Sequence, residues 1–141
     1  IADPQRAMTA IDVKTGETIW RTAQSMVRET IGLSEDGTKV YSKTMQDTLV
    51  CYSALGNTPR RLWYSIVGYG YDHAPSMPIE KEGNIFGSTK NGLIFCLDAN
   101  NGKILWKHKI GNTLINTVVP LNSNECIFTT SSGIVGRLTA N

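Results

Sequence analysis

The sequence has 141 residues, of which 40% are hydrophobic and 18% are charged, with 14 basic residues against 12 acidic ones. This composition excludes an intrinsically disordered chain, and the small net charge of +2 argues against nucleic acid as the main partner. No apolar run is long enough to span a bilayer, and three cysteines without a Cys-x-x-Cys spacing argue against a disulfide framework and against a zinc site.

The first 23 residues contain a hairpin pattern followed by a turn and a tryptophan. Ile1 falls within a predicted strand, and residues 3–6 form the predicted hairpin loop, since Asp and Pro favour turns. The chain continues as Ala10-Ile11-Asp12-Val13-Lys14-Thr15-Gly16-Glu17-Thr18-Ile19-Trp20. Because the sequence opens inside a strand, without Met and without signal-peptide character, we expect it to be a piece of a larger protein.

The tryptophan pattern recurs along the chain. Trp63 and Trp106 follow Trp20 at intervals of 43 residues, and residues 96–106 align with residues 10–20 without gaps. The middle copy has Ser53 in place of Asp and two extra residues in its turn, and a fourth copy begins at residues 133–140. Upstream of three copies, a polar turn precedes the matched segments Val40-Tyr41-Ser42, Ile85-Phe86-Gly87 and Ile127-Phe128-Thr129. Such a period indicates one supersecondary unit per repeat.

Each repeat is expected to contain four short strands. In the best-preserved repeat the turns at 80–83, 90–92 and 100–102 contain Gly, and the middle turn carries the strong hairpin pair Asn91-Gly92. The predicted strands are 74–79, 84–89, 93–98 and 103–110. On the last of them, alternation places Ile104, Trp106, His108 and Ile110 on one face.

These patterns predict an all-β fold, a β-propeller fragment of about three four-stranded antiparallel blades. The expected blade boundaries are 1–23 for the end of one blade, 24–66 and 67–110 for two blades, and 111–141 for an incomplete blade. A β-sandwich with coincidental repeats is the alternative, although a sandwich gives no reason for Trp to return at a fixed spacing.

Structural roles are predicted for the repeated residues. A Trp on the outer strand can fill the gap between adjacent blades, and the Gly four residues earlier permits a tight reversal with positive φ. The small residues Ala10, Cys51 and Cys96 would allow close approach of the blades. The residues assigned to this docking arrangement are Trp20, Trp63, Trp106, Gly16, Gly102, Asp12 and Asp98.

The main candidate for ligand or partner binding is the loop before the first strand of the third repeat. Tyr69, Tyr71, Asp72 and His73 combine two aromatic rings, a carboxylate and an imidazole, and such loops surround the central channel of a propeller. The alternative is that the two tyrosines pack between blades while Asp72 and His73 cap the loop. Side chains in equivalent or neighbouring loops are further candidates for this rim: Arg28, Lys43, Lys90 and Asn112.

The pattern from Ala10 to Trp20 resembles the tryptophan-docking motif of PQQ-like propeller repeats. That superfamily includes quinoprotein dehydrogenases and the BamB type of outer-membrane β-barrel assembly lipoprotein. The quinoprotein enzymes hold PQQ with a vicinal Cys-Cys disulfide, a stacking Trp and a Ca²⁺ site. The sequence has no adjacent cysteines, and its three tryptophans occupy docking positions, so the resemblance implies the repeat without a cofactor or a metal. The chain as a whole also resembles the C-terminal propeller that some proteins of the Bacteroidetes type carry behind a metallophosphoesterase domain, a comparison prompted by residues 69–78.

The expected function is therefore recognition. The chain has no G-x-S-x-G elbow, no phosphate-binding P-loop and no H-E-x-x-H motif, so we expect a non-catalytic module for protein–protein interaction or ligand recognition. Its expected partners are the remaining blades of a parent propeller, or a second copy of the chain, together with a protein partner. Two alternatives remain open, a remnant of a PQQ-dependent dehydrogenase and a regulatory propeller fused to an upstream hydrolase. By analogy with the superfamily, the expected location is the periplasm or cell envelope.

Overall fold

The computed structural model describes residues 1–3, 5–68, 76–89 and 91–140. Within these ranges the chain forms strands and turns, and no helix that could cross a membrane is found among them. The strands are β1 (Met8–Ile11), β2 (Thr18–Thr22), β3 (Val27–Leu33), β4 (Lys39–Thr44), β5 (Thr48–Ser53), β6 (Arg61–Ile66), β7 (Ile79–Lys81), β8 (Asn84–Ser88), β9 (Leu93–Asp98), β10 (Ile104–Lys109), β11 (Ile115–Asn122), β12 (Glu125–Thr130) and β13 (Val135–Thr139).

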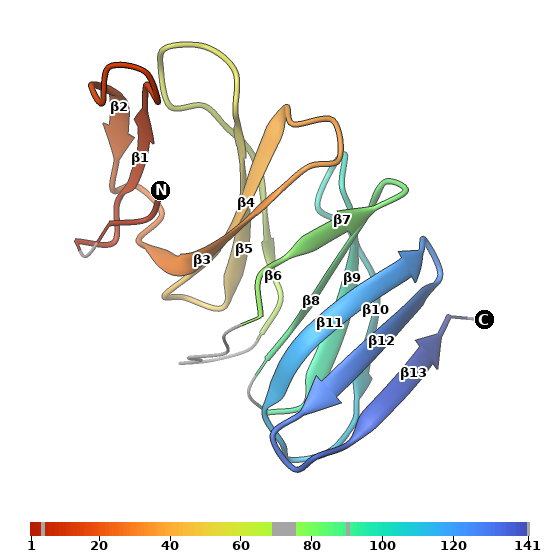
Figure 1. Ribbon diagram of the computed structural model, residues 1–141. Helices are drawn as coiled ribbons and strands as arrows, with labels where there is room; N and C mark the ends of the chain where they lie inside the picture. The colour runs from red at the N-terminus through yellow and green to blue at the C-terminus, as the bar shows by residue number, and fades with distance from the viewer. Residues whose placement is uncertain (4, 69–75, 90, 141) are drawn as a thin grey trace.

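The strands form four antiparallel sheets that follow one another along the chain (Figure 1). The strand orders are β1-β2, β3-β4-β5-β6, β7-β8-β9-β10 and β11-β12-β13, so within each sheet a strand pairs with its neighbours in sequence. The first strands β3, β7 and β11 contact one another in succession and form the inner side of the stack, while β2, β6 and β10 lie on the outer side. Four-stranded meanders stacked in this way are propeller blades, and the predicted all-β propeller class is confirmed.

The core consists of three apolar clusters, one between each pair of adjacent sheets. Each cluster contains one of the three tryptophans, and in each case the Trp comes from the outer strand of the earlier sheet. Trp20 pairs with Ala10, Trp63 with Cys51 and Trp106 with Cys96 across the outermost strand pair. The three indoles therefore occupy matching positions in successive sheets.

A β-bulge beside each Trp corrects the expectation that Ile104 and Trp106 share one face. The pairing register shifts between Ile104 and Trp106, and Ile104 packs in the cluster of the preceding interface while Trp106 packs in the next one. An extra residue in one strand reverses the side-chain alternation. The same shift occurs before Trp20 and Trp63, so the bulge directs each indole toward the following sheet.

The turn at the start of the third repeat is shorter than predicted. Glu80 and Lys81 belong to β7, which begins at Ile79, and the turn is the pair Glu82-Gly83 with φ of 50° and 78°. Two successive residues with positive φ make a hairpin turn that matches the twist of its strands, so pairing continues directly up to it. The expected strand over 74–79 is therefore wrong at its end, and residues 74 and 75 lie outside the described ranges.

The last two sheets each place an aromatic ring over a glycine on the neighbouring strand. Gly87 on β8 lies opposite Phe95 on β9, whereas in the last sheet Phe128 on β12 lies opposite Gly136 on β13. The ring and the glycine have exchanged strands, and both rings face the preceding sheet. By register Phe128 thus corresponds to Gly87. The sequence alignment of residues 127–129 with residues 85–87 matches it instead with Phe86, one residue away.

Replacing Gly87 by alanine is expected to destabilise the chain by about 1–3 kcal/mol, the usual cost of overpacking a core. An added Cβ would lie 2.4 Å from Cζ of the fully buried Phe95. Chemical denaturation measures the loss, and Phe95→Leu in the same chain should recover part of it because the shorter side chain leaves room for the methyl group. A Gly87→Ala variant as stable as the wild type would contradict this packing.

The turn between β3 and β4 is held by one carboxylate. Asp36 accepts hydrogen bonds from the Ser34 hydroxyl at 2.7 Å, from the Thr38 hydroxyl at 2.8 Å and from the Thr38 amide at 2.9 Å. The hydrogen bond from Ser34, followed by those from Thr38, lowers the pKa of Asp36 from 3.8 to about 2.

Because the folded-state pKa of Asp36 is depressed, its stabilising contribution is present above pH 3.8 and is lost as the pH falls toward 2. We expect Asp36→Asn to be less stable than the wild type at neutral pH, with a gap in melting temperature that narrows between about pH 4 and pH 2. Thermal unfolding monitored across this range measures the gap, and a gap independent of pH would show that the charge is not what holds the turn.

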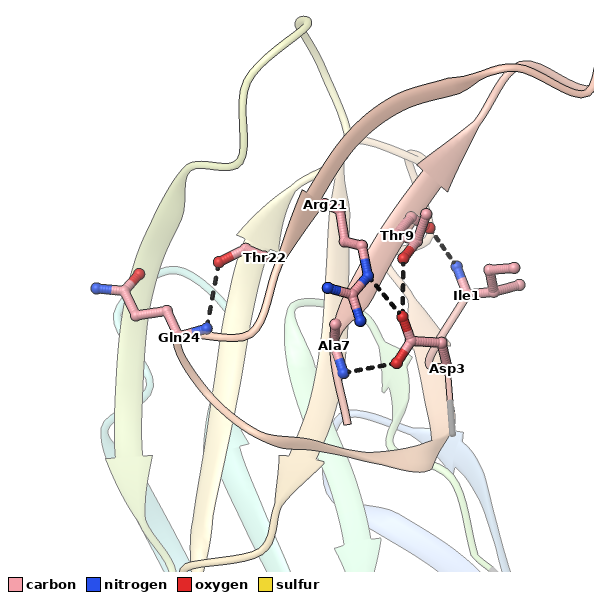
Figure 2. A network of polar contacts seen from close by, with 7 residues as sticks. All are labelled: Ile1, Asp3, Ala7, Thr9, Arg21, Thr22 and Gln24. Atoms are coloured by element: carbon pink, nitrogen blue, oxygen red, sulfur yellow. Dashed lines mark hydrogen bonds and ion pairs between the residues drawn. The ribbon is translucent and has the colours of Figure 1, made fainter. Parts of the chain in front are cut away.

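A second carboxylate organises the first hairpin (Figure 2). Asp3 accepts the Ala7 amide and the Arg21 Nε–H, each at 2.9 Å, and the amino group of Ile1 donates to the Thr9 carbonyl at 2.7 Å. The backbone hydrogen bond from Ala7, ahead of the contact with Arg21, lowers the pKa of Asp3. Through Thr9 and Arg21, Asp3 is thus joined to β1 and to β2.

Candidate functional site

The sequence predicts that the binding residues share one end of the blades, the end at which β4 and β8 finish and β3 and β7 begin in the structure. Five of them, Tyr69, Tyr71, Asp72, His73 and Lys90, lie outside the described residues. Arg28 and Lys43 are described, and the structure brings both to this end.

Arg28 lies near the start of β3 and is only 2% exposed. Its Nε–H donates to the carbonyl oxygen of Thr44, the last residue of β4, at 3.3 Å. This contact places a guanidinium inside the protein at the end of the second sheet.

Lys43 is a second buried cation at this end, also 2% exposed. Its Nζ donates to the carbonyl of Ser88 on the next sheet at 3.3 Å. The hydroxyl of Ser88 in turn lies 2.6 Å from that of Ser76, and both serines are buried. Sequence reasoning missed these serines, since isolated serines in strand and loop segments carry no recognisable motif.

Asn112 occupies a different place from Arg28 and Lys43. It is exposed and lines an open pocket of about 580 Å³ between the last two sheets. Hydroxyl groups gather in this pocket, where Thr113 Oγ1 lies 3.2 Å from Ser132 Oγ. Neither Arg28 nor Lys43 lines it, so the structure does not bring Asn112 together with the two cations.

At the opposite end, Trp63 contacts the turn that follows β9. Its Nε1–H donates to the Ala99 carbonyl at 3.2 Å, and its six-membered ring lies against Gly102. A Cβ added to Gly102 would come within 2.5 Å of the indole, while φ at this glycine is +73°. Glycine is therefore required here both for the turn conformation and for the close approach of the ring.

The turn that receives Trp63 has the same construction as the turn between β1 and β2. Asp98 accepts the Asn100 amide at 2.7 Å, and Asp12 accepts the Lys14 amide at 2.8 Å. The glycine of each turn donates to the carbonyl of its Asp at 2.8 Å. However, Gly16 has no atom within 4 Å of an added Cβ, so among the described residues only the second of these two turns packs against an indole.

The other two tryptophans pack differently. Trp106 meets Phe86 edge-on, with ring centroids 6.0 Å apart, and packs in the cluster that includes Leu138. Trp20 packs in the cluster of Val27, Val50 and Tyr52. The turn after β5 that corresponds to the Asp98–Gly102 turn carries the two extra residues, and its Gly56 has no atom within 4 Å of an added Cβ.

Carboxylates also link successive sheets, in an arrangement that the sequence did not reveal. Glu35 accepts the amide of Glu82 in the next sheet at 2.8 Å, and Glu82 accepts the amide of Ser123 in the sheet after it at 3.0 Å. Each turn between the first two strands of a sheet thus provides an acceptor for the following turn. Glu35 and Glu82 thus have a structural role, since their carboxylates join successive sheets.

The cysteines of the described part of the chain are all buried, and its acidic side chains do not gather into a metal-binding cluster. Within the described ranges, no three His, Cys, Asp or Glu side chains converge to hold a metal ion. Burial raises the pKa of the thiols of Cys51 and Cys96 to about 12 and that of Cys126 to about 11. The thiols are therefore protonated at neutral pH and are poor nucleophiles.

Comparisons with solved structures place this fold among β-propellers. BamB from Moraxella catarrhalis is similar with a TM-score of 0.73 at 17% identity, covering 95% of this chain and 39% of that one. The computationally designed Ika4 protein gives 0.78 at 14% identity, with coverage of 97% and 81%. The Cps50 (Swd1) β-propeller domain of Myceliophteria thermophila gives 0.77 at 10% identity, with coverage of 97% and 46%.

The chain thus spans 39% of the length of the BamB structure that it matches. Curated protein sequences give no match. A family model described as outer membrane protein assembly factor BamB matches residues 55–140, which is more than half of the chain. On this match, the chain belongs to the PQQ-like repeat family of outer membrane protein assembly factor BamB.

Proposed function

We propose that the chain is a non-catalytic propeller module that recognises a protein partner with the sheet end that carries Arg28 and Lys43. The observation that carries the proposal is the pair of buried cationic side chains at that end. At the opposite end, by contrast, several turns are engaged in contacts between sheets, namely the turns of Glu35 and Glu82 and the turn after β9 that receives Trp63. The predicted loop residues Tyr69, Tyr71, Asp72 and His73, and Lys90, are proposed to belong to the same recognition surface.

The family description supports a role in assembly and an envelope location. It names an outer membrane assembly factor, and we propose by analogy that this chain also works in the periplasm or at the cell envelope. The alternatives of a quinoprotein remnant and of a propeller fused to a hydrolase gain no support from the described residues. Addition of PQQ with Ca²⁺ is therefore expected to leave the melting temperature unchanged, and a clear increase would favour the quinoprotein alternative.

Site-specific photo-crosslinking in cells tests which end meets the partner. The crosslinking residue is placed at exposed Met77, which follows the predicted loop in the sequence. In a matched control it is placed at exposed Lys14, in the turn between β1 and β2 at the opposite end. The proposal expects a discrete crosslinked protein from position 77 and none from position 14. Crosslinking from position 14 alone, or from neither position, would contradict it.

An exposed apolar sheet face supports a second kind of partner. Val119 pairs with Ile127, and Val135 lies on the same face of the last sheet, all at least 36% exposed. Apolar strand faces of this kind favour association, and we propose that another blade covers them, from a parent propeller or from a second copy. Sedimentation of the chain alone should then show self-association that Val135→Lys weakens, and a strict monomer would exclude the second copy.

A further inference from the structure

Arg28 has two donor groups without an acceptor. Within the described part of the chain, its Nη1 and Nη2 atoms are buried and have no hydrogen-bond partner. Only Nε is engaged, by the Thr44 carbonyl. Burying guanidinium N–H groups without acceptors is costly, because they lose their hydrogen bonds to water. The arrangement is favourable only when an acceptor meets both nitrogens.

The described carboxylates do not provide that acceptor. Their ion pairs join Asp3 to Arg21, Glu35 to Lys81 and Glu125 to Arg137. These three cations are all partly exposed, whereas Arg28 is buried. In the ranges that the structure describes, the most deeply buried guanidinium thus has no carboxylate partner.

A second buried cation lies on β4, the strand that Arg28 contacts. Lys43 precedes Thr44, whose carbonyl binds Arg28, and its own amine is also buried. Two buried cations at one sheet end produce a positive potential that favours an anion. The Lys43 amine already has a defined contact with Ser88, so we assign it a supporting electrostatic role.

We propose that Arg28 binds an oxyanion, a carboxylate or phosphate group of a ligand, through its Nη1–H and Nη2–H groups. The two parallel donors of a guanidinium fit such a group in a bidentate manner. This inference deepens the proposed recognition function and rests on it for the location of the site, since it names the chemical group that the partner would present.

The position of Arg28 in its strand suggests how an anion reaches it. The pairing of β3 with β4 is irregular between Val27 and Ile31, the interval that contains Arg28. A strand segment without a continuous ladder opens locally at a lower cost than a regular one. We infer that a small anion enters through this irregular segment of β3.

Thermal unfolding of the purified chain tests the site directly. Chloride is replaced by inorganic phosphate in one series and by acetate in another, at constant pH and ionic strength. The wild type should gain several degrees in melting temperature in at least one series, since ligand binding stabilises the folded state. The series that responds identifies the oxyanion as phosphate-like or carboxylate-like.

Two variants separate binding from general salt effects, because phosphate also stabilises proteins by exclusion from their surface. Arg28→Met should lose the excess response, while Arg21→Met, which removes a partly exposed guanidinium, should keep it. If Arg28→Met does not fold, Arg28→Lys retains the charge without the fork and should show an apparent affinity at least about tenfold weaker.

An equal response of the wild type and the Arg28 variant would overturn the proposal, as would no response of the wild type to either anion. The titration requires no protein partner. The anion site can therefore fail while crosslinking at position 77 succeeds, and the reverse outcome is equally distinguishable.

Discussion

Replacing Trp63 by alanine is expected to lower the free energy of unfolding by about 3 kcal/mol, near the lower end of the range for removing a large aromatic ring from a core. The ring is half-buried, lies 5.9 Å from the Tyr41 ring between centroids, and its Nε1–H donates to Ala99 on the next sheet. The variant would lose the apolar contact and leave the Ala99 carbonyl without this donor. Urea denaturation of both proteins measures the difference.

The neighbouring residue on the same strand provides the control. Tyr64 is 59% exposed and its ring contacts the Arg61 guanidinium at 5.2 Å, so Tyr64→Ala should cost less than about 1 kcal/mol. Trp63→Phe should fall between the two, because it retains a ring but loses the hydrogen bond. Equal losses for Trp63→Ala and Tyr64→Ala would show that the indole does not hold the two sheets together.

Gly102→Ala is expected to cost about 2–4 kcal/mol, the sum of two effects at one residue. A non-glycine residue with positive φ costs about 1–2 kcal/mol, and a Cβ within 2.5 Å of the Trp63 ring adds the cost of overpacking. Gly102 is buried under the indole, so neither the turn nor the ring can move without disturbing the other. The measurement is again the free energy of unfolding.

Gly16→Ala is a closely matched control for this substitution. Gly16 has a φ of +75° in the same kind of turn, and an added Cβ meets no atom within 4 Å. It should therefore show the backbone cost alone, about 1–2 kcal/mol. If Gly16→Ala costs as much as Gly102→Ala, the contact with Trp63 contributes nothing to the requirement for glycine.

The architecture could be predicted because its main signals are local and repeated. Turn residues such as Asn91-Gly92 and the spacing of the tryptophans define strands and period without any knowledge of tertiary contacts. The boundaries of β9, predicted as 93–98, agree with the structure. Errors arose at β7, because a two-residue turn with positive φ at Glu82 was not distinguishable from a longer polar loop.

The contacts between sheets could not be predicted, because they depend on register. A bulge before each Trp reverses the side-chain alternation, and no residue type in the sequence marks its position. The exchange of Phe and Gly between strands in the last two sheets is likewise visible only from the pairing of Gly87 with Phe95 and of Phe128 with Gly136. The burial of Arg28 could not be predicted either, since the sequence indicates only that this residue lies near the predicted rim.

The coupling between Trp63 and Gly102 tests most directly whether the indole of one sheet docks on the turn of the next. In the wild-type background Gly102→Ala carries both the backbone and the packing cost, whereas in a Trp63→Ala background the methyl group meets no ring. A double-mutant cycle should therefore give a coupling energy of at least about 1 kcal/mol, with Gly102→Ala costing no more than Gly16→Ala once the indole is absent. Additive losses, with Gly102→Ala equally costly in both backgrounds, would contradict the docking of one blade on the next.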